Sequence, residues 1–158
     1  MVLDDLDTEI LKLLENDARI SYRNISEKLD ISVGTVHNRI DKLKKQGIIK
    51  GYLLHLDDQK LNYTLKAVIS LVIKGTKLKD ILSKFSEFPQ VTSVYSISGS
   101  VSAVLICRFQ NMEDFRDFTN ILNEEESIQQ METNIVLDVY KEDFHHLLSN
   151  SRSIDTEE

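Results

Sequence analysis

The stretch ISVGTVHNRIDKLKKQG, residues 31–47, decides the fold of the N-terminal third of the chain. Its apolar residues recur at spacings of three and four, which predicts a helix with one buried face. These residues are Val33, Val36, Ile40 and Leu43. Ser32 before them is a favourable N-cap, and Gly47 ends the helix because glycine readily adopts the left-handed C′ conformation.

Two further helices are predicted before this one. The first has apolar residues at helical spacing between residues 6 and 14, and acidic residues crowd its first turn, where anions complement the helix dipole. The second begins after Ser21, another favourable N-cap. Residues 48–56 are rich in β-branched and aromatic side chains and predict a strand. Residues 1–56 therefore predict a winged helix-turn-helix, with the strand as its wing.

The chain carries a net charge of −7, which by itself opposes binding to a polyanion. The charge is unevenly distributed, because residues 1–60 hold 10 Lys and Arg against 11 Asp and Glu, whereas residues 61–158 hold 9 against 15. Within residues 32–50 there are five cations, and the only anion is Asp41, which gives a local charge of +4. We expect DNA to meet this patch in one preferred orientation.

On a helical projection, the outward face of the helix after Ser32 is small, polar and basic, as base reading requires. Asn38 suits adenine, and Thr35 offers both a methyl group and a hydroxyl to base edges. Cations further along the helix suit phosphates, and the helix N-terminus after Ser21 also favours one. The predicted DNA-binding residues are Ser21, Tyr22, Ser32, Gly34, Thr35, His37, Asn38, Arg39, Lys42 and Lys45. The alternative is a three-helix bundle with a solvated basic face.

Residues 57–63 are polar without a clear period and predict a linker or short turn. Beyond them, residues 64–143 follow the order β-α-β-β-α-β, the split ferredoxin-like arrangement of an α+β fold. The predicted strands are residues 65–73, 91–98, 101–109 and 130–140, and the predicted helices are residues 77–88 and 112–123. A short helix over residues 143–148 follows, and residues 144–158 predict a partly disordered end.

Both faces of the predicted strand over residues 101–109 are apolar. One side carries Val101, Ala103, Leu105 and Cys107, and the other carries Val104 and Ile106. Two helices cover only one face of a four-stranded sheet, so we expect a second copy of the chain on the other face, in a homodimer built sheet to sheet. Cys107, the single cysteine, excludes an internal disulfide and is expected to be a buried hydrophobe.

Several strings of the N-terminal half strongly resemble the Lrp/AsnC, or feast/famine, family of regulators. They are DDLD at residues 4–7, NDARIS at 16–21, ISVGTV at 31–36, RIDKL at 39–43 and GIIKGY at 47–52. The order of elements in the second half is similar to that family's ligand-sensing and assembly domain, and the resemblance covers residues 3–143. It implies a transcriptional regulator that binds double-stranded DNA, forms dimers, tetramers or octamers, and holds an amino-acid effector between dimers.

The hairpin turn departs from the family's pattern. In the family the turn typically reads Gly, two variable residues and Asp, whereas here it reads Gly99-Ser100-Val101-Ser102. The effector-binding residues that the resemblance implies are Ser98, Gly99, Ser100, Val101, Ser102 and Thr133. A hydroxyl in place of the carboxylate holds an ammonium group less well. An architectural protein that wraps DNA without an effector therefore stays open as an alternative.

Other function classes find little support in the chain. We expect no enzyme, metal or cofactor, because no Gly-rich phosphate loop, metal-ligand spacing or nucleophile motif occurs, and His145 and His146 as neighbours share no helix face. Some relatives of the fold are sirohaem decarboxylases, but the basic third helix argues against that activity here. An acidic start and the lack of a long apolar run predict a cytoplasmic protein without membrane contact.

Overall fold

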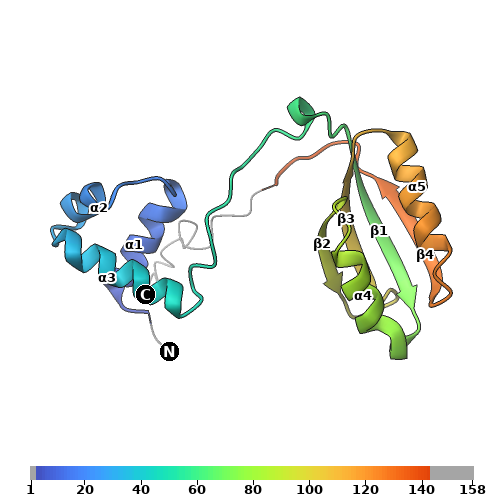
Figure 1. Cartoon of the computed structure of the whole chain (residues 1–158), viewed down its shortest axis with the longest axis horizontal. Helices are drawn as coiled ribbons and strands as arrows, with labels where there is room; N and C mark the ends of the chain where they lie inside the picture. Colours follow the sequence, from blue (N-terminus) through green and yellow to red (C-terminus); the bar gives the residue numbers. More distant parts are fainter. Residues whose placement is uncertain (1–2, 143–158) are drawn as a thin grey trace, which may run out of the picture. The chain divides into compact units, whose positions relative to one another are not determined.

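The computed structural model describes residues 3–142, which fall into two compact units (Figure 1). The residues up to Leu54 belong to the first unit, and His55–Tyr140 form the second. Each unit has its own hydrophobic core.

The first unit consists of three helices. They are α1 (Asp5–Asn16), α2 (Tyr22–Leu29) and α3 (Val33–Lys45). The predicted caps are confirmed, because the side chain of Ser21 accepts from the N–H of Asn24 and that of Ser32 accepts from the N–H of Thr35. Asp4 caps α1 in the same way. The buried core consists of Ile10, Leu14, Ile25, Val36 and Ile40.

Helix α3 ends as predicted at Gly47, whose φ of 71° lies in the left-handed region. The N–H of Gly47 donates to the carbonyl of Lys44, and the N–H of Ile48 donates to the carbonyl of Leu43. These two bonds form a Schellman motif, which satisfies carbonyls that the helix itself leaves unpaired.

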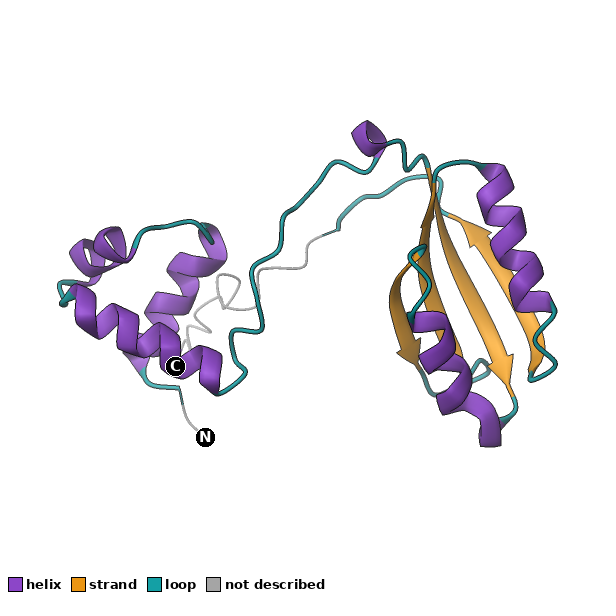
Figure 2. Ribbon diagram, in the orientation of Figure 1, coloured by secondary structure: helices purple, strands orange, loops and turns teal. Residues whose placement is uncertain are grey.

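The prediction of a strand over residues 48–56 is wrong. The described chain contains no strand in this segment, which runs as an irregular loop (Figure 2). A strand needs a neighbour that completes its backbone hydrogen bonds, and none of the described segments pairs with this one. Ile48 and Ile49 are half-buried, and the apolar side chains that follow are exposed; they are Tyr52, Leu53, Leu54 and Leu56. The polar residues that follow contain a short 3-10 helix, η1 (Gln59–Leu61).

The second unit is an antiparallel sheet with two helices, in the predicted order β-α-β-β-α-β (Figure 2). Its elements are β1 (Leu65–Ile73), η2 (Gly75–Lys77), α4 (Leu78–Ser86), β2 (Val91–Ser96), β3 (Ala103–Phe109), α5 (Met112–Asn123) and β4 (Ile128–Ile135). The strands lie in the order β2-β3-β1-β4, so the two central strands are joined to each other by hydrogen bonds.

Four strand boundaries differ from the prediction. Strand β2 ends two residues early, at Ser96, and strand β4 begins two residues early, at Ile128. Strand β4 ends at Ile135, five residues early, because its partner β1 begins at Leu65 and the last bond of the pair joins the N–H of Val136 to Lys66. Beyond that point the chain has no ladder to join, and Leu137 is 90% exposed. Strand β3 begins two residues late, at Ala103. The predicted helix over residues 143–148 lies outside the described residues.

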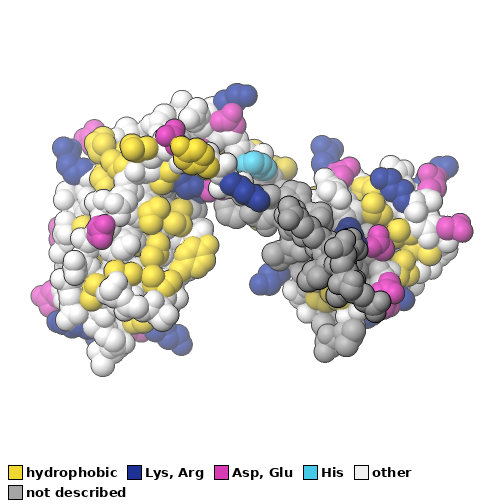
Figure 3. Space-filling view, turned by 180° about the vertical axis from the view of Figure 1, so that it is seen from behind, with side chains coloured by type: hydrophobic (Ala, Val, Ile, Leu, Met, Phe, Trp, Pro, Cys, Tyr) yellow, Lys and Arg dark blue, Asp and Glu magenta, His cyan; other side chains and the backbone are white. Residues whose placement is uncertain are grey.

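The two faces of the sheet have different surroundings. Helices α4 and α5 cover one face, where they bury every second residue of the central strands. Cys107 belongs to this core, and burial raises the pKa of its thiol to about 12, which agrees with its predicted role as a hydrophobe. The apolar residues on the open face are only half-buried; they include Val68, Val72, Val104 and Ile106. Figure 3 shows hydrophobic side chains gathered on the surface of this unit that faces away from the helices.

None of the helices within residues 3–142 is both long and apolar enough to cross a bilayer.

Candidate nucleic-acid interface and sensor turn

The outward face of α3 agrees with the helical projection. Of the four apolar residues predicted to form the buried face, Val36, Ile40 and Leu43 are fully buried, whereas Val33, in the first turn of the helix, is 47% exposed. Gly34, Asn38 and Lys45 are exposed on the opposite side of the helix. This ridge combines a residue without a side chain, an amide and an ammonium group, so it can approach a base edge closely and also meet a phosphate.

The hydroxyl groups at the start of α3 are already used in capping. Ser32 Oγ accepts from the N–H of Thr35 at 3.0 Å, and the two hydroxyls share a hydrogen bond of 2.9 Å. Ser21 Oγ accepts from the N–H of Asn24 at 3.1 Å at the start of α2. The structure thus fixes the rotamers of Ser32 and Thr35, and it leaves the methyl group of Thr35 as the freer recognition element.

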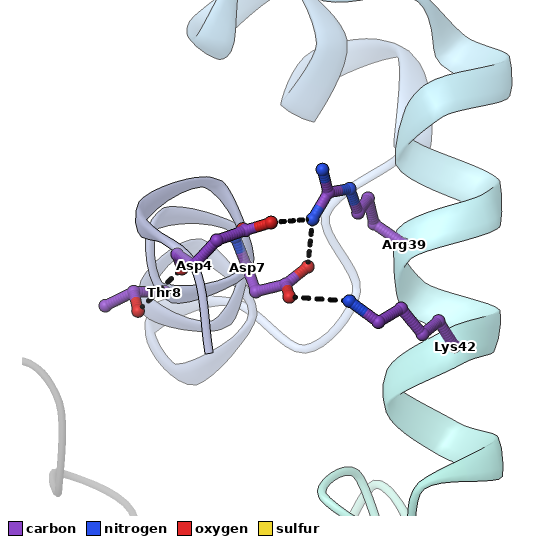
Figure 4. Close-up of polar contacts among 5 residues, drawn as sticks. All are labelled: Asp4, Asp7, Thr8, Arg39 and Lys42. Carbon is purple, nitrogen blue, oxygen red and sulfur yellow. Dashed lines mark hydrogen bonds and ion pairs between the residues drawn. The ribbon is translucent and has the colours of Figure 1, made fainter. Parts of the chain in front are cut away.

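One flank of α3 is joined to α1 by ion pairs (Figure 4). Arg39 donates from Nη1 to carboxylate oxygens of both Asp4 and Asp7, the latter at 3.1 Å. Lys42 donates from Nζ to the other carboxylate oxygen of Asp7 at 3.3 Å. Hydrogen bonding to Arg39 lowers the pKa of Asp4, and hydrogen bonding to Asp4 and Asp7 raises the pKa of Arg39.

These ion pairs change the charge that α3 presents. Arg39 and Lys42 supply two of the five cations counted in the predicted patch, and the carboxylates of Asp4, the N-cap of α1, and Asp7, in its first turn, neutralise them. The sequence alone predicts that Arg39 and Lys42 bind phosphates, and it relates the acidic first turn only to the helix dipole. Ile10 of α1 and Val36 of α3 lie on the apolar faces of their helices and share one core. This packing, which places the start of α1 beside α3, was the signal that could have linked the acidic turn with Arg39 and Lys42.

The other flank of α3 faces α2 and the loop after Gly47. The ring of His37 meets the ring of Tyr22 edge-on at 5.9 Å between centroids, and its Nδ1 lies 3.5 Å from Asp41. Lys44 lies over the ring of Tyr52 at 5.4 Å. His37 is more than half exposed, so it can turn toward a ligand without breaking the core.

The hairpin turn that follows β2, residues 99–102, is called the sensor turn after its predicted role, and it is tied to the end of β1. Gly99 has φ of 128°, which only glycine adopts without strain. Ser102 Oγ accepts from the N–H of Ile73 at 3.1 Å, and the N–H of Ser102 donates to the carbonyl of Leu71 at 2.8 Å. The hydroxyl that stands where the family has a carboxylate thus has a structural role in this fold.

The other residues predicted to bind an effector are accessible or half-buried. Ser98, Gly99 and Ser100 are exposed, and Val101 is half-buried. Thr133 is exposed on β4 and pairs with Ile69 of β1, two residues along that strand from the carbonyl that Ser102 holds. The turn and Thr133 therefore both adjoin β1 from opposite sides. Within residues 3–142 no group of three or more His, Cys, Asp or Glu side chains is arranged to hold a metal ion, and the pair His145 and His146 lies outside the described residues.

Family models match both halves of the chain. A winged helix-turn-helix DNA-binding model matches residues 3–50, and an Lrp/AsnC ligand binding domain model matches residues 66–145. An uncharacterized HTH-type transcriptional regulator of Pyrococcus furiosus is 38% identical over 144 residues, which are 91% of this chain and 97% of the relative. The regulatory protein AsnC of Haemophilus influenzae is 34% identical over 104 residues, which are 65% of this chain and 69% of the relative.

Solved structures have the same fold. Escherichia coli AsnC superposes with a TM-score of 0.83 at 26% identity and covers 90% of this chain and 97% of its own. A transcriptional regulator of Neisseria meningitidis, solved as a complex with L-Met, superposes with a TM-score of 0.84 at 24% identity, over 91% of this chain and 96% of its own.

Proposed function

Because this chain belongs to the Lrp/AsnC family of transcriptional regulators, we propose that it binds a two-fold symmetric DNA site as a homodimer in the cytoplasm, with α3 as the recognition helix. The single observation that carries this assignment is the division of α3 into a fully buried face and an exposed ridge of Gly34, Asn38 and Lys45. In a helix-turn-helix, the second helix of the motif enters the major groove with such a ridge.

The proposed dimer forms through the open face of the sheet. Val68, Val72, Val104 and Ile106 form an apolar surface there, flanked by the exposed ring of Tyr95. A second copy would cover this surface, and two-fold symmetry would place two copies of α3 on half-sites one helical turn, or a multiple of it, apart. Further association to tetramers or octamers is the extension that the family suggests.

Binding experiments with single variants test the recognition helix. Asn38→Ala should reduce discrimination between a selected site and random DNA, because it removes a base-reading amide worth about 1–3 kcal/mol. Lys45→Ala should weaken binding to both DNAs and reduce the salt slope by about one. Lys79→Ala, an exposed cation on α4, removes the same charge from the other unit and serves as the matched control. Unchanged binding by both α3 variants would contradict the assignment.

We also propose that an amino acid is the effector and that it binds beside the sensor turn. The solved complex of a similar protein with L-Met supports this ligand class, and the exposed turn at Gly99, with Thr133 on the other side of β1, supports an accessible polar surface. Because Ser102 carries no charge, binding should be weaker than in a turn with an aspartate.

Thermal unfolding in the presence of each of the twenty amino acids tests the effector. A ligand at 100 times its Kd stabilises the native state by about 2.7 kcal/mol, which is a measurable shift in Tm. If none of the twenty shifts the Tm or the DNA affinity, the protein is a DNA-wrapping architectural protein instead. The commitment of the Ser102 hydroxyl to Ile73 is the observation that favours this second function.

A further inference from the structure

We propose that Asp4 is an internal competitor for DNA phosphate, which holds Arg39 and thereby lowers the affinity of α3 for DNA of any sequence. This inference rests on the proposed DNA-binding role of α3. It concerns the four charged groups of Figure 4, which come from the N-cap and first turn of α1 and from α3.

The two carboxylates around Arg39 lie in different environments. The side chain of Asp7 is 1% exposed, whereas that of Asp4 is 49% exposed and that of Arg39 is 29% exposed. A buried carboxylate without a cation is strongly unfavourable, so Asp7 must keep Arg39 or Lys42. Asp4 is half in water and is solvated well when it loses its partner. The contact between Asp4 and Arg39 is therefore the one that can be exchanged.

The guanidinium has room for a new anion without leaving Asp7. Both of its carboxylate contacts run through Nη1, and a guanidinium has five N–H donors in a rigid fork. A phosphate could thus bind through the other nitrogens while Asp7 stays paired. Arg39 lies one residue from Asn38 of the recognition ridge, so DNA that reaches the ridge also comes close to Arg39.

Asp4 reduces the affinity that the protein gains when Arg39 binds a DNA phosphate. A phosphate that binds Arg39 also comes close to the negative charge of Asp4, so the two anions repel each other or the contact between Asp4 and Arg39 must break. Arg39 therefore adds little to the electrostatic part of DNA binding while Asp4 is charged. This part is sequence-independent and supplies nearly all of non-specific affinity. Asp4 should therefore shorten the time that the regulator spends on DNA without its site.

The test compares Asp4→Asn with Asp5→Asn in the full-length protein on random duplex DNA. Asparagine caps a helix as well as aspartate does, so Asp4→Asn removes the charge and keeps the start of α1. Asp5 is an exposed carboxylate in the same turn and gives the same change in net charge. We expect Asp4→Asn to bind about two- to tenfold more tightly and to steepen the salt slope by about 0.9, the value for one more phosphate contact. Asp5→Asn should leave the slope unchanged.

The gain must also depend on Arg39. In an Arg39→Gln background, with folding checked by circular dichroism, Asp4→Asn should give no more than the small gain of Asp5→Asn. The inference is overturned if Asp4→Asn binds no more tightly than Asp5→Asn, or if its gain persists without Arg39. Lys45→Ala separates the two proposals: if it weakens binding while Asp4→Asn has no effect, only the competitor role fails, and if neither variant changes binding, the recognition face itself is wrong.

Discussion

The hydroxyl of Ser102 lies 3.1 Å from the backbone nitrogen of Ile73, and this hydrogen bond ties the turn before β3 to the end of β1. The same hydroxyl lies 3.4 Å from the carbonyl oxygen of Ile73. One side chain therefore satisfies both backbone groups of the last residue of β1. In a turn with an aspartate at this position, a carboxylate could accept from the N–H but could not donate to the carbonyl.

Ser102→Asp should lower the free energy of unfolding and strengthen the binding of an amino-acid effector. The carboxylate restores the charge that pairs with an α-amino group, so amino-acid binding should tighten about tenfold, in line with the greater strength of charge-assisted hydrogen bonds. Calorimetric titration with amino acids measures the change. Ser100→Asp places the same charge on the exposed part of the turn and is the control. Equal binding by the two variants would show that the position of the charge is irrelevant.

The pair between Lys84 and Glu125 should make the second unit less stable in acid. Hydrogen bonding to Lys84, at 2.8 Å, lowers the pKa of Glu125 below its ordinary value of 4.5. A lowered pKa stabilises the folded state above the unfolded value, and this stabilisation is lost as the pH falls below 4.5 and through the lowered pKa. Glu125→Gln should therefore flatten the decrease of Tm with pH in that range. Glu124→Gln, a neighbouring exposed carboxylate, should not change it.

Phe118→Ala should destabilise the second unit by about 3–5 kcal/mol, the usual cost of deleting a buried aromatic ring. Phe118 is 1% exposed and meets three other rings, those of Phe85, Phe88 and Phe109. Denaturant unfolding gives the free energy. Ile121 lies on the same helix but is 38% exposed, so Ile121→Ala should cost less than about half as much. Comparable losses would mean that the ring cluster is not the centre of the core.

Ile106→Arg should shift the protein from the proposed dimer to a monomer. The substitution places a charge in the middle of the open apolar face, where a partner sheet would leave it unpaired. Sedimentation velocity at several concentrations measures the assembly. Asn120→Arg adds the same charge to the exposed side of α5 and should leave the assembly unchanged. A dimer that survives Ile106→Arg would place the interface elsewhere.

Local patterns predicted most of the helices and strands. The bounds of α2, α3, β1 and α5 follow directly from N-cap residues, from Gly47 and from apolar periodicity, which act within a few residues of the chain. The strand predicted over residues 48–56 failed because β propensity describes the side chains and gives no ladder partner. The predicted end of β4 was wrong for the same reason, because β4 ends where its partner β1 begins.

The candidate site was predictable only in part. The exposed ridge around Asn38 follows from one helix and its period. The pairing of Arg39 with Asp4 and Asp7 depends on how two helices pack, and the residues are more than thirty positions apart in the chain. The local charge of +4 includes the cations of α3 but not Asp4 and Asp7, the anions that neutralise two of them. A charge patch in a sequence is therefore an upper limit for the charge that a folded surface presents.

The burial of Cys107 makes this regulator a convenient scaffold for site-specific labelling. Its thiol is enclosed in the core, and its raised pKa of about 12 keeps nearly all of it protonated at neutral pH. Because the chain has no other cysteine, one introduced at a surface position becomes the sole reactive thiol. A fluorophore or spin probe attached at Lys79 or Asn120 would then report distances in solution without removal of any native residue.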